Sequence, residues 1–279
     1  MHQKYRLILF LFLIATAEPL CAENGQWPSG EIIKAVKAEG SCAIVGMSAE
    51  QSQLLALQRA RAAVIEQAAG VSVSSATLVT NYVIAVDFIK TYAKGFIIGE
   101  QVVWLPLRQY QKDPSTAPIP EFRVKITADV YVPGKKTKSL ELTGKLNHTV
   151  FRNGEKAKVT IHTSRDSRVA VFNIRADDRV AMLFPNNYET GNRISAGHEW
   201  VFPARDSRVD LEMRTLPGHE KDAEAIFVVA VDGSHPVEFM AMFPGEDPMS
   251  FTEFFKRLSE IADYGQDLIL PYEVVGTEK

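Results

Sequence analysis

The chain has 279 residues, of which 46% are hydrophobic and 23% are charged, and its formal net charge is −3. This length suits two modest domains with buried cores. Lysine and arginine are scattered among acidic residues without a basic block, so the composition argues against nucleic-acid binding.

The first 22 residues have the pattern of a secretory signal peptide. Lys4 and Arg6 give a basic start, and an apolar run follows over Leu7–Ala17. The run is much shorter than the roughly 20 residues that a membrane span needs. We therefore expect cleavage after Ala22, a periplasmic or secreted product, and no membrane span in the mature chain.

The two cysteines, Cys21 and Cys42, are expected to have separate fates. If Cys21 leaves with the signal peptide, the mature chain has no partner for an intramolecular disulfide. Lipidation of Cys21 is an alternative, which the large Leu20 before it disfavours. Cys42 lies in an apolar run, which favours a buried structural thiol over a reactive one.

Residues 23–134 are predicted to form a small α+β domain. After a predicted strand over Gly40–Met47, Ser48 and Gln51 have the spacing of a helix capping box, and Gly70 ends the helix. We expect a second helix over 81–93 and strands over 96–107 and 122–132, while 32–36 could be a short helix or a strand. The polar face of the first helix is expected to carry Gln58, Arg59, Arg61 and Glu66.

A second domain, 140–279, is predicted to be a mainly-β, sandwich-like domain with one C-terminal helix. Pro133-Gly134-Lys135-Lys136 breaks the preceding pattern, so the boundary is expected between Pro133 and Lys145. Short strands alternate with turns, as at Asn153-Gly154. Ser250 and Glu253 predict the start of an amphipathic helix that Gly265 ends. The expected strands are 140–146, 156–163, 169–174, 180–184, 199–202, 209–213, 225–231 and 268–275.

The second domain resembles the family called domain of unknown function 4384. The resemblance lies in Gly154-Glu155, Ser167–Ile174, Leu183-Phe184-Pro185-Asn186 and Ala196-Gly197. It extends over about 146–231 and departs from the family at one turn, where an arginine follows Asp178 in place of glycine. The resemblance implies an accessory domain with a binding or scaffolding role.

The first domain is similar, more weakly, to the N-terminal domain of the flagellar assembly protein T and to small outer-membrane lipoproteins. This similarity rests on Gly40–Gly46, the alanine-rich helix Ala56–Gly70 and Asp129-Val130. It implies an accessory component of a flagellar or secretion apparatus.

The sequence carries no motif of catalytic, metal or cofactor chemistry. It lacks HExxH, a nucleophile elbow and a phosphate loop, and its six histidines do not pair at a metal-ligand spacing. We therefore expect no cofactor and no metal. Two carboxylate pairs, Asp177/Asp178 and Asp206/Asp210, are expected to cap turns.

The candidate contact residues lie in loops of the second domain. We expect Phe184 to fill the core and Asn186 to hold its turn, which leaves Asn187 and Tyr188 as contact candidates.

Arg165 and Arg205 begin two copies of the sequence Arg-Asp-Ser-Arg-Val, which could place two arginine-bearing loops on one face.

These observations favour a non-enzymatic binding or scaffolding protein of the cell envelope. Its expected partner is an envelope protein or cell-wall material. An accessory role in a flagellar or secretion apparatus and an unrecognised hydrolase are the alternatives. A deep pocket with clustered, perturbed ionisable groups would favour the hydrolase, whereas an exposed apolar patch would favour binding.

Overall fold

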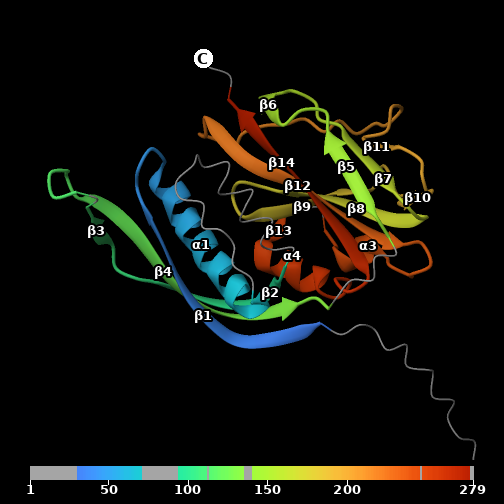
Figure 1. Ribbon diagram of the computed structural model, residues 1–279. Coiled ribbons are helices and arrows are strands. Elements are labelled where there is room, and N and C mark those ends of the chain that lie inside the picture. Colours follow the sequence, from blue (N-terminus) through green and yellow to red (C-terminus); the bar gives the residue numbers. More distant parts are fainter. Residues whose placement is uncertain (1–29, 71–93, 112, 135–139, 246, 277–279) are drawn as a thin grey trace, which may run out of the picture.

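A computed structural model describes residues 30–70, 94–111, 113–134, 140–245 and 247–276. The predicted signal peptide, the predicted helix over 81–93 and the centre of the predicted domain boundary, 135–139, lie outside the described residues. The described chain forms an N-terminal sheet with one helix, followed by two further sheets and two helices (Figure 1).

The N-terminal sheet is antiparallel, with the order β1-β4-β2, and β3 also pairs with β4. Its elements are β1 (Glu31–Ala43), α1 (Ala49–Ala69), β2 (Phe96–Trp104), β3 (Arg108–Tyr110) and β4 (Ile119–Val132). Alternate residues of β4 from Val124 to Val130 are buried, so one face of the sheet forms the core. Helix α1 covers this face, and β3 and the adjoining end of β4 project beyond the helix (Figure 1).

Local signals set the ends of α1 as predicted. The Ser48 hydroxyl accepts a hydrogen bond from the Gln51 amide at 3.1 Å, and the Gln51 side chain accepts one from the Ser48 amide at 3.0 Å. Gly70 closes the helix in the left-handed conformation, with φ 62°. At Gly40 a Cβ atom would lie 2.1 Å from the Ala56 carbonyl oxygen, so glycine is what lets α1 approach β1.

The rest of the chain forms a seven-stranded and a three-stranded sheet. The three-stranded sheet has the order β11-β7-β5, and the larger sheet has the order β13-β9-β8-β12-β14-β6, with β10 also beside β8. Their elements are β5 (Leu142–Leu146), β6 (Val150–Arg152), β7 (Val159–Thr163), β8 (Ser167–Ile174), β9 (Arg179–Phe184), β10 (Arg193–Ile194), β11 (Trp200–Phe202), β12 (Lys221–Asp232), α3 (Phe239–Met242), β13 (Met249–Ser250), α4 (Phe251–Leu258) and β14 (Gly265–Val275).

The seven-stranded sheet is buried on both faces. Alternate residues of β8 point to opposite sides, so Val169 and Val171 pack toward the three-stranded sheet while Ala170 and Phe172 pack toward α4. The first side is a sandwich core. The second side is aromatic, with Phe172 4.9 Å from Phe254 between ring centroids.

The aromatic side also joins the two halves of the chain. One hydrophobic cluster contains residues of α1, β2 and β4 together with residues of β8, β12 and α4. Phe96 at the start of β2 stacks on Phe255 of α4, with 5.5 Å between ring centroids. The proposed division at Pro133–Lys145 stays a prediction, to be tested on the protein in solution.

The predicted fold classes are confirmed: an α+β N-terminal part and a mainly-β, sandwich-like C-terminal part. Several details differ. The residues from Glu31 onward join β1, because they pair with β4 as far as Val132. The strand expected over 209–213 is reduced to one bridge between Lys156 and Glu212. A short helix, α3, precedes α4, and α4 ends at Leu258.

Candidate functional site

A cleft of ≈ 570 Å³ lies between the first half of α1 and the C-terminal sheets. Its walls come from the β1–α1 connection and α1, the β8–β9 turn, the start of β12 and the first residue of α4. The side chains that the following argument uses are Gln51, Leu54, Gln58, Arg175, Asp178, His219, Lys221 and Asp222. A concave site with mixed polar and apolar walls is the usual form of a ligand site.

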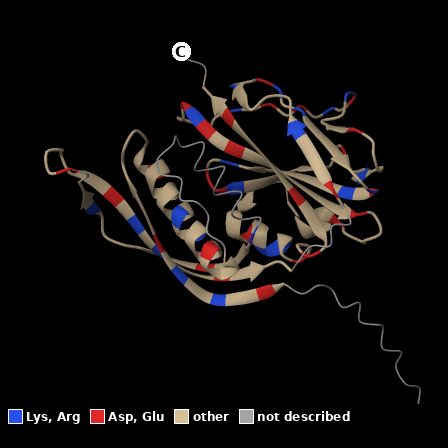
Figure 2. Ribbon diagram, viewed as in Figure 1, with Lys and Arg blue, Asp and Glu red and all other residues tan. Residues whose placement is uncertain are grey.

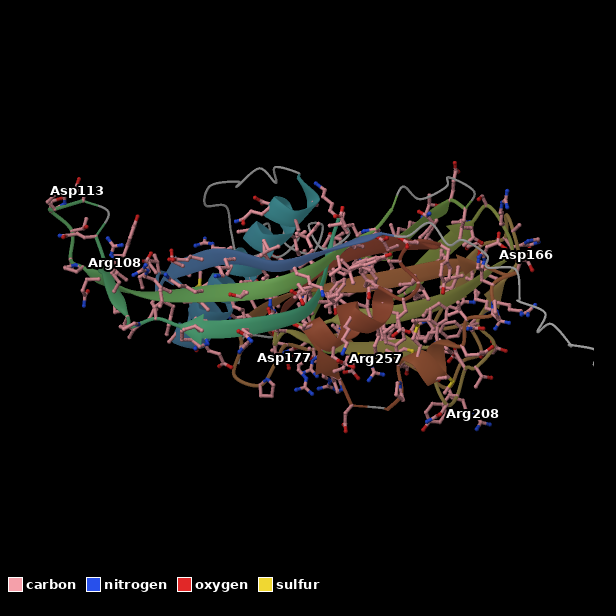
Figure 3. All side chains as sticks on the ribbon, turned by 90° about the horizontal axis from the view of Figure 1, so that it is seen from below. Arg108, Asp113, Asp166, Asp177, Arg208 and Arg257 are labelled. Carbon is pink, nitrogen blue, oxygen red and sulfur yellow. The ribbon has the colours of Figure 1, made fainter. Side chains whose placement is uncertain are left out.

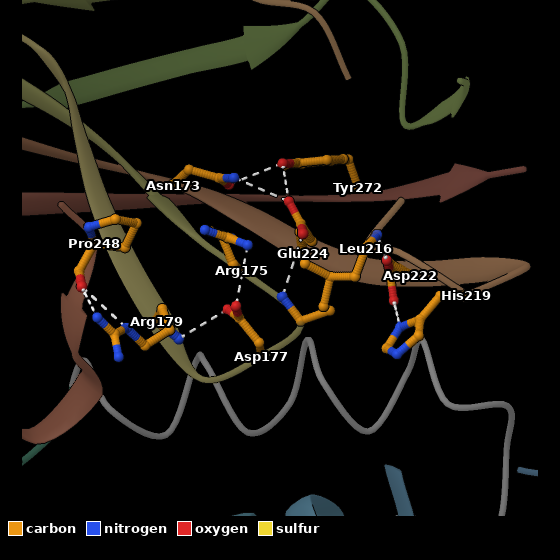
Figure 4. Close-up of polar contacts among 11 residues, drawn as sticks. Asn173, Arg175, Asp177, Arg179, Leu216, His219, Asp222, Glu224, Pro248 and Tyr272 are labelled. Atoms are coloured by element: carbon orange, nitrogen blue, oxygen red, sulfur yellow. Dashed lines mark hydrogen bonds and ion pairs between the residues drawn. The ribbon is translucent and has the colours of Figure 1, made fainter. Parts of the chain in front are cut away.

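His219 is held in the cleft wall by a buried aspartate. Its Nδ1 lies 2.6 Å from Oδ1 of Asp222, and the other oxygen of Asp222 accepts the Leu216 amide at 2.5 Å (Figure 4). Asp222 is only 3% exposed. Because a carboxylate accepts, Nδ1 carries the proton, and Nε2 is the ring nitrogen left for another hydrogen bond.

The two cationic side chains that line the cleft are each paired with a carboxylate. Arg175 lies 3.0 Å from Asp177, and Lys221 lies 2.8 Å from Glu273. Beside them Arg179 donates through Nε to the Pro248 carbonyl at 3.0 Å (Figure 4). The charged groups of this wall are thus fixed in orientation by the protein itself.

One wall of the cleft leads to a buried ionic network centred on Arg61 of α1. The guanidinium donates to both carboxylate oxygens of Glu100, at 2.6 and 3.0 Å, and to Asp178 at 2.6 Å. Thr252 donates to Glu100 at 2.8 Å, and the guanidinium carbon lies 5.5 Å from the Phe251 ring centroid. The network joins α1 and β2 to the β8–β9 turn and α4.

The position predicted for Arg61 is wrong. The sequence analysis placed this side chain on the exposed polar face of the helix. Only 5% of Arg61 is exposed, because the C-terminal half covers this side of α1. Asp178 is corrected likewise. It does occupy the turn, in the left-handed region with φ 63°, but its carboxylate reaches across to Arg61 instead of capping its own backbone.

The pKa values of the two carboxyl groups that bind Arg61 are shifted in opposite directions. Burial raises the pKa of Glu100, but the hydrogen bonds and charge of Arg61 outweigh burial, so the pKa is lowered overall. Burial dominates at Asp178 and raises the pKa of that carboxyl despite Arg61, with the charge of Glu100 adding to the rise. One guanidinium therefore compensates Glu100 more fully than Asp178.

A second buried carboxyl, Glu224, lies two residues beyond Asp222 on β12. The Tyr272 hydroxyl lies 2.6 Å from Glu224 Oε2 and 2.8 Å from Asn173 Oδ1 (Figure 4). A hydroxyl has one proton and cannot donate to both oxygens. Tyr272 donates to Glu224 when that carboxyl is ionised, whereas a protonated Glu224 would donate to Tyr272 and leave Tyr272 to donate to Asn173. Burial also raises the pKa of Glu224, which favours the protonated form.

Comparison with known families identifies the part of the chain that carries much of this wall. Residues 150–223 match the family described as Domain of unknown function (DUF4384). The family resemblance predicted for the C-terminal part is thereby confirmed. No curated protein matches the chain. The similarity of the N-terminal part to flagellar and lipoprotein domains receives no support from these comparisons.

The DUF4384 match runs from β6 into the start of β12 and includes His219 and Asp222. The folded unit is larger than the match. Strand β5 precedes the matched residues and pairs with β7, and β14 follows them and lies between β12 and β6. The cleft combines a wall from the DUF4384 region with a wall from α1.

The loop after β9 of the DUF4384 region has the predicted internal structure. Phe184 is 2% exposed, and the Asn186 side chain bonds the Leu183 carbonyl and the amides of Tyr188 and Glu189 at 2.7–2.8 Å. Tyr188 is 77% exposed, and Asn187 beside it is also exposed. Neither residue lines the cleft, so their role in contacts stays a prediction.

Arg165 and Arg205 lie at opposite ends of β7. Arg165 follows the last residue of β7, Thr163, and lies 3.7 Å from Asp232. Arg205 follows β11, whose last residue pairs with the first residue of β7, Val159. Because β7 spans roughly 13 Å, the repeated sequence does not bring these two arginines to one strand end.

The remaining candidate chemistry is dispersed. Asp177 accepts the Arg179 amide at 3.3 Å, as predicted for a turn, and Asp210 pairs with Lys156 at 2.7 Å. Cys42 is buried, as expected. In the described part of the chain no three His, Cys, Asp or Glu side chains gather as a metal site would require, and no helix there is long and apolar enough to span a membrane.

The sequence analysis missed His219 and Asp222. A local signal for them exists in Leu216-Pro217-Gly218-His219, a turn sequence in which Gly218 has φ 80° and the His219 amide bonds the Leu216 carbonyl at 3.0 Å. Asp222, three residues after His219, is the second residue of β12, a largely buried strand.

Proposed function

We propose that the protein is an exported, non-enzymatic binding or scaffolding module of the cell envelope that recognises its partner in the cleft between α1 and the DUF4384 region. The observation that carries this proposal is the fixed state of the cleft's polar groups. His219, Arg175 and Lys221 are each held by a carboxylate. In the described residues no hydroxyl or thiol is hydrogen-bonded to His219, so the arrangement presents fixed recognition groups and lacks an activated nucleophile.

The composition of the cleft indicates what the partner must offer. Gln51 and Gln58 supply amide groups from α1, and Leu54 between them supplies apolar surface. A segment of an envelope protein or a piece of cell-wall material, with hydrogen-bonding groups beside apolar ones, has this chemistry. The sequence pattern of residues 1–22 supports an envelope location.

A matched pair of variants on α1 tests the proposal. Gln58 lines the cleft and Gln53, on the same helix, does not. Binding of purified envelope proteins and of soluble cell-wall fragments is measured by calorimetry. We expect Gln58→Arg to weaken binding at least tenfold and Gln53→Arg to leave it unchanged. Equal behaviour of the two variants would show that the cleft is not the binding site.

A hydrolase is the second candidate, and the His219–Asp222 pair is the observation that favours it. Such a pair can orient a general base, although the nucleophile is missing from its hydrogen bonds in the described residues. We expect no turnover of ester, phosphate, peptide or glycoside substrates. A measurable rate that His219→Gln abolishes, while the protein stays folded, would replace the binding proposal with the enzymatic one.

A further inference from the structure

The outer half of β2 exposes large apolar side chains that the described elements cover only in part. Val102, Val103 and Trp104 are 37%, 58% and 39% exposed, and farther along the same edge Leu107 is 59% exposed. In Figure 3 the labelled Arg108 and Asp113 mark the projecting end of this sheet, away from the C-terminal body.

This part of β2 is also a free edge of the sheet. Among the described residues β2 pairs with β4 and with no other strand. The Leu105 amide donates to the Arg123 carbonyl of β4 at 3.0 Å. Because inward and outward groups alternate along an antiparallel strand, the amides and carbonyls of Val102 and Trp104 point outward.

Charged residues are present on the neighbouring strands but absent from this edge. Acidic and basic residues are interspersed along β1 and β4 (Figure 2), where Glu39 pairs with Lys125 at 2.8 Å. The edge itself has no charged residue from Gln101 to Leu107. Exposed edges are usually protected by charges or proline. Here Pro106 offers no amide, so a ladder along this edge ends beside Leu105.

We propose that the free edge of β2 pairs with the same edge of a second copy of this chain, antiparallel and about a two-fold axis at Val103. The outward groups of Val102 then meet those of Trp104 in the second copy, and Val103 faces Val103. This pairing is independent of the cleft and of the function proposed for it.

Three features select a second copy as the occupant. A two-fold interface must be complementary to itself, and this register places a β-branched residue opposite an aromatic one twice, which is a favourable cross-strand pair. A charged edge would bring like charges together across the axis, and this edge has none between Gln101 and Leu107. The ladder is also short enough to stop before Pro106 and before Glu100, which Arg61 already binds.

Cysteine cross-linking tests the register directly. In the full chain with Cys21 and Cys42 replaced by serine, Val103→Cys should form a disulfide-linked dimer on mild oxidation, because the axis brings the two copies of this residue together. Gln101→Cys is the matched control on the same face. Its two copies would lie more than about 13 Å apart, so it should stay monomeric.

Sedimentation equilibrium tests the association itself. We expect the unmodified chain to dimerise, and Val103→Lys to weaken dimerisation at least tenfold by placing like charges opposite each other. Thr127→Lys, which adds the same charge on the same outer face in β4, should not. The proposal is overturned if the unmodified chain is monomeric, if both cysteine variants cross-link equally, or if a different protein or a lipid vesicle occupies the edge of the monomer.

Discussion

The seven-stranded sheet and the N-terminal sheet differ in how much of each is covered. The first is packed on one face by the three-stranded sheet and on the other by α4, so β12 is buried along most of its length. The second has one face covered by α1, and its β4 alternates buried and accessible residues. In both sheets the pattern of apolar residues along a strand matches the number of its faces that are covered. The outer half of β2 is the exception, because it is apolar although it is only partly covered.

The largest expected effect comes from the doubly covered part. Phe184 is buried against Trp200 and Phe202, with ring centroids 4.8 and 5.5 Å apart. Truncation of a buried phenylalanine costs about 3–5 kcal/mol. We expect Phe184→Ala to lower the free energy of unfolding by that amount in chemical denaturation. Tyr188→Ala, on the exposed side of the same loop, should change it by less than about 0.5 kcal/mol. A wild-type stability for Phe184→Ala would contradict the sandwich core described here.

The next effect concerns the ionic network between the halves. Arg61→Met leaves the buried carboxylates of Glu100 and Asp178 without their cation, and we expect a loss of about 3 kcal/mol. Arg59→Met is the control. Arg59 lies two residues earlier on α1, and its exposed side chain only donates to the Ser41 carbonyl. Denaturation of both variants measures the difference. Adding Glu100→Gln and Asp178→Asn should recover most of the stability, and a failure to recover it would show that the loss is one of packing.

The residues that sequence reasoning predicted well depend on local chemistry. Ser48, Gln51 and Gly70 set the helix ends, and Phe184 and Asn186 set the β9 loop, through contacts within a few residues. The burial of Arg61, in contrast, involves a hydrogen-bond partner that is 117 residues away in the chain. A helical pattern does not show which face of the helix a distant sheet will cover. The Arg61 network and one wall of the cleft could therefore not be predicted from the sequence.

A cut in the chain tests whether the two differently covered sheets belong to separate domains. We predict that limited proteolysis of the native protein cuts between Pro133 and Lys145 and leaves two resistant pieces, identified by mass spectrometry. The shared cluster around Phe96 and Phe255 should keep the pieces associated after the cut. Cleavage at scattered sites in both halves would show that this segment is not a domain boundary.

The smallest effect, a dependence of stability on pH, compares the two carboxyls whose pKa burial raises. Glu224 lies beside Tyr272 and Asn173, and Asp178 lies beside Arg61. A carboxyl with a raised pKa keeps its proton in the folded state at pH values where the unfolded chain has lost it. Stability therefore falls as the pH rises from the unfolded pKa, near 4.5 for glutamate, through the folded pKa, and it is constant above that.

Glu224→Gln should remove its share of this fall, because an amide does not lose a proton in this pH range. We expect the stability of the variant relative to the wild type to rise between pH 4.5 and pH 8, by about 1.4 kcal/mol for each unit of pKa shift. Urea denaturation at a series of pH values measures this difference. Asp178→Asn is the comparison, and it should gain less at pH 8, because it also removes the charge that pairs with Arg61. Equal slopes for the wild type and Glu224→Gln would mean that Glu224 is ionised in the folded protein, against the protonated form that burial favours.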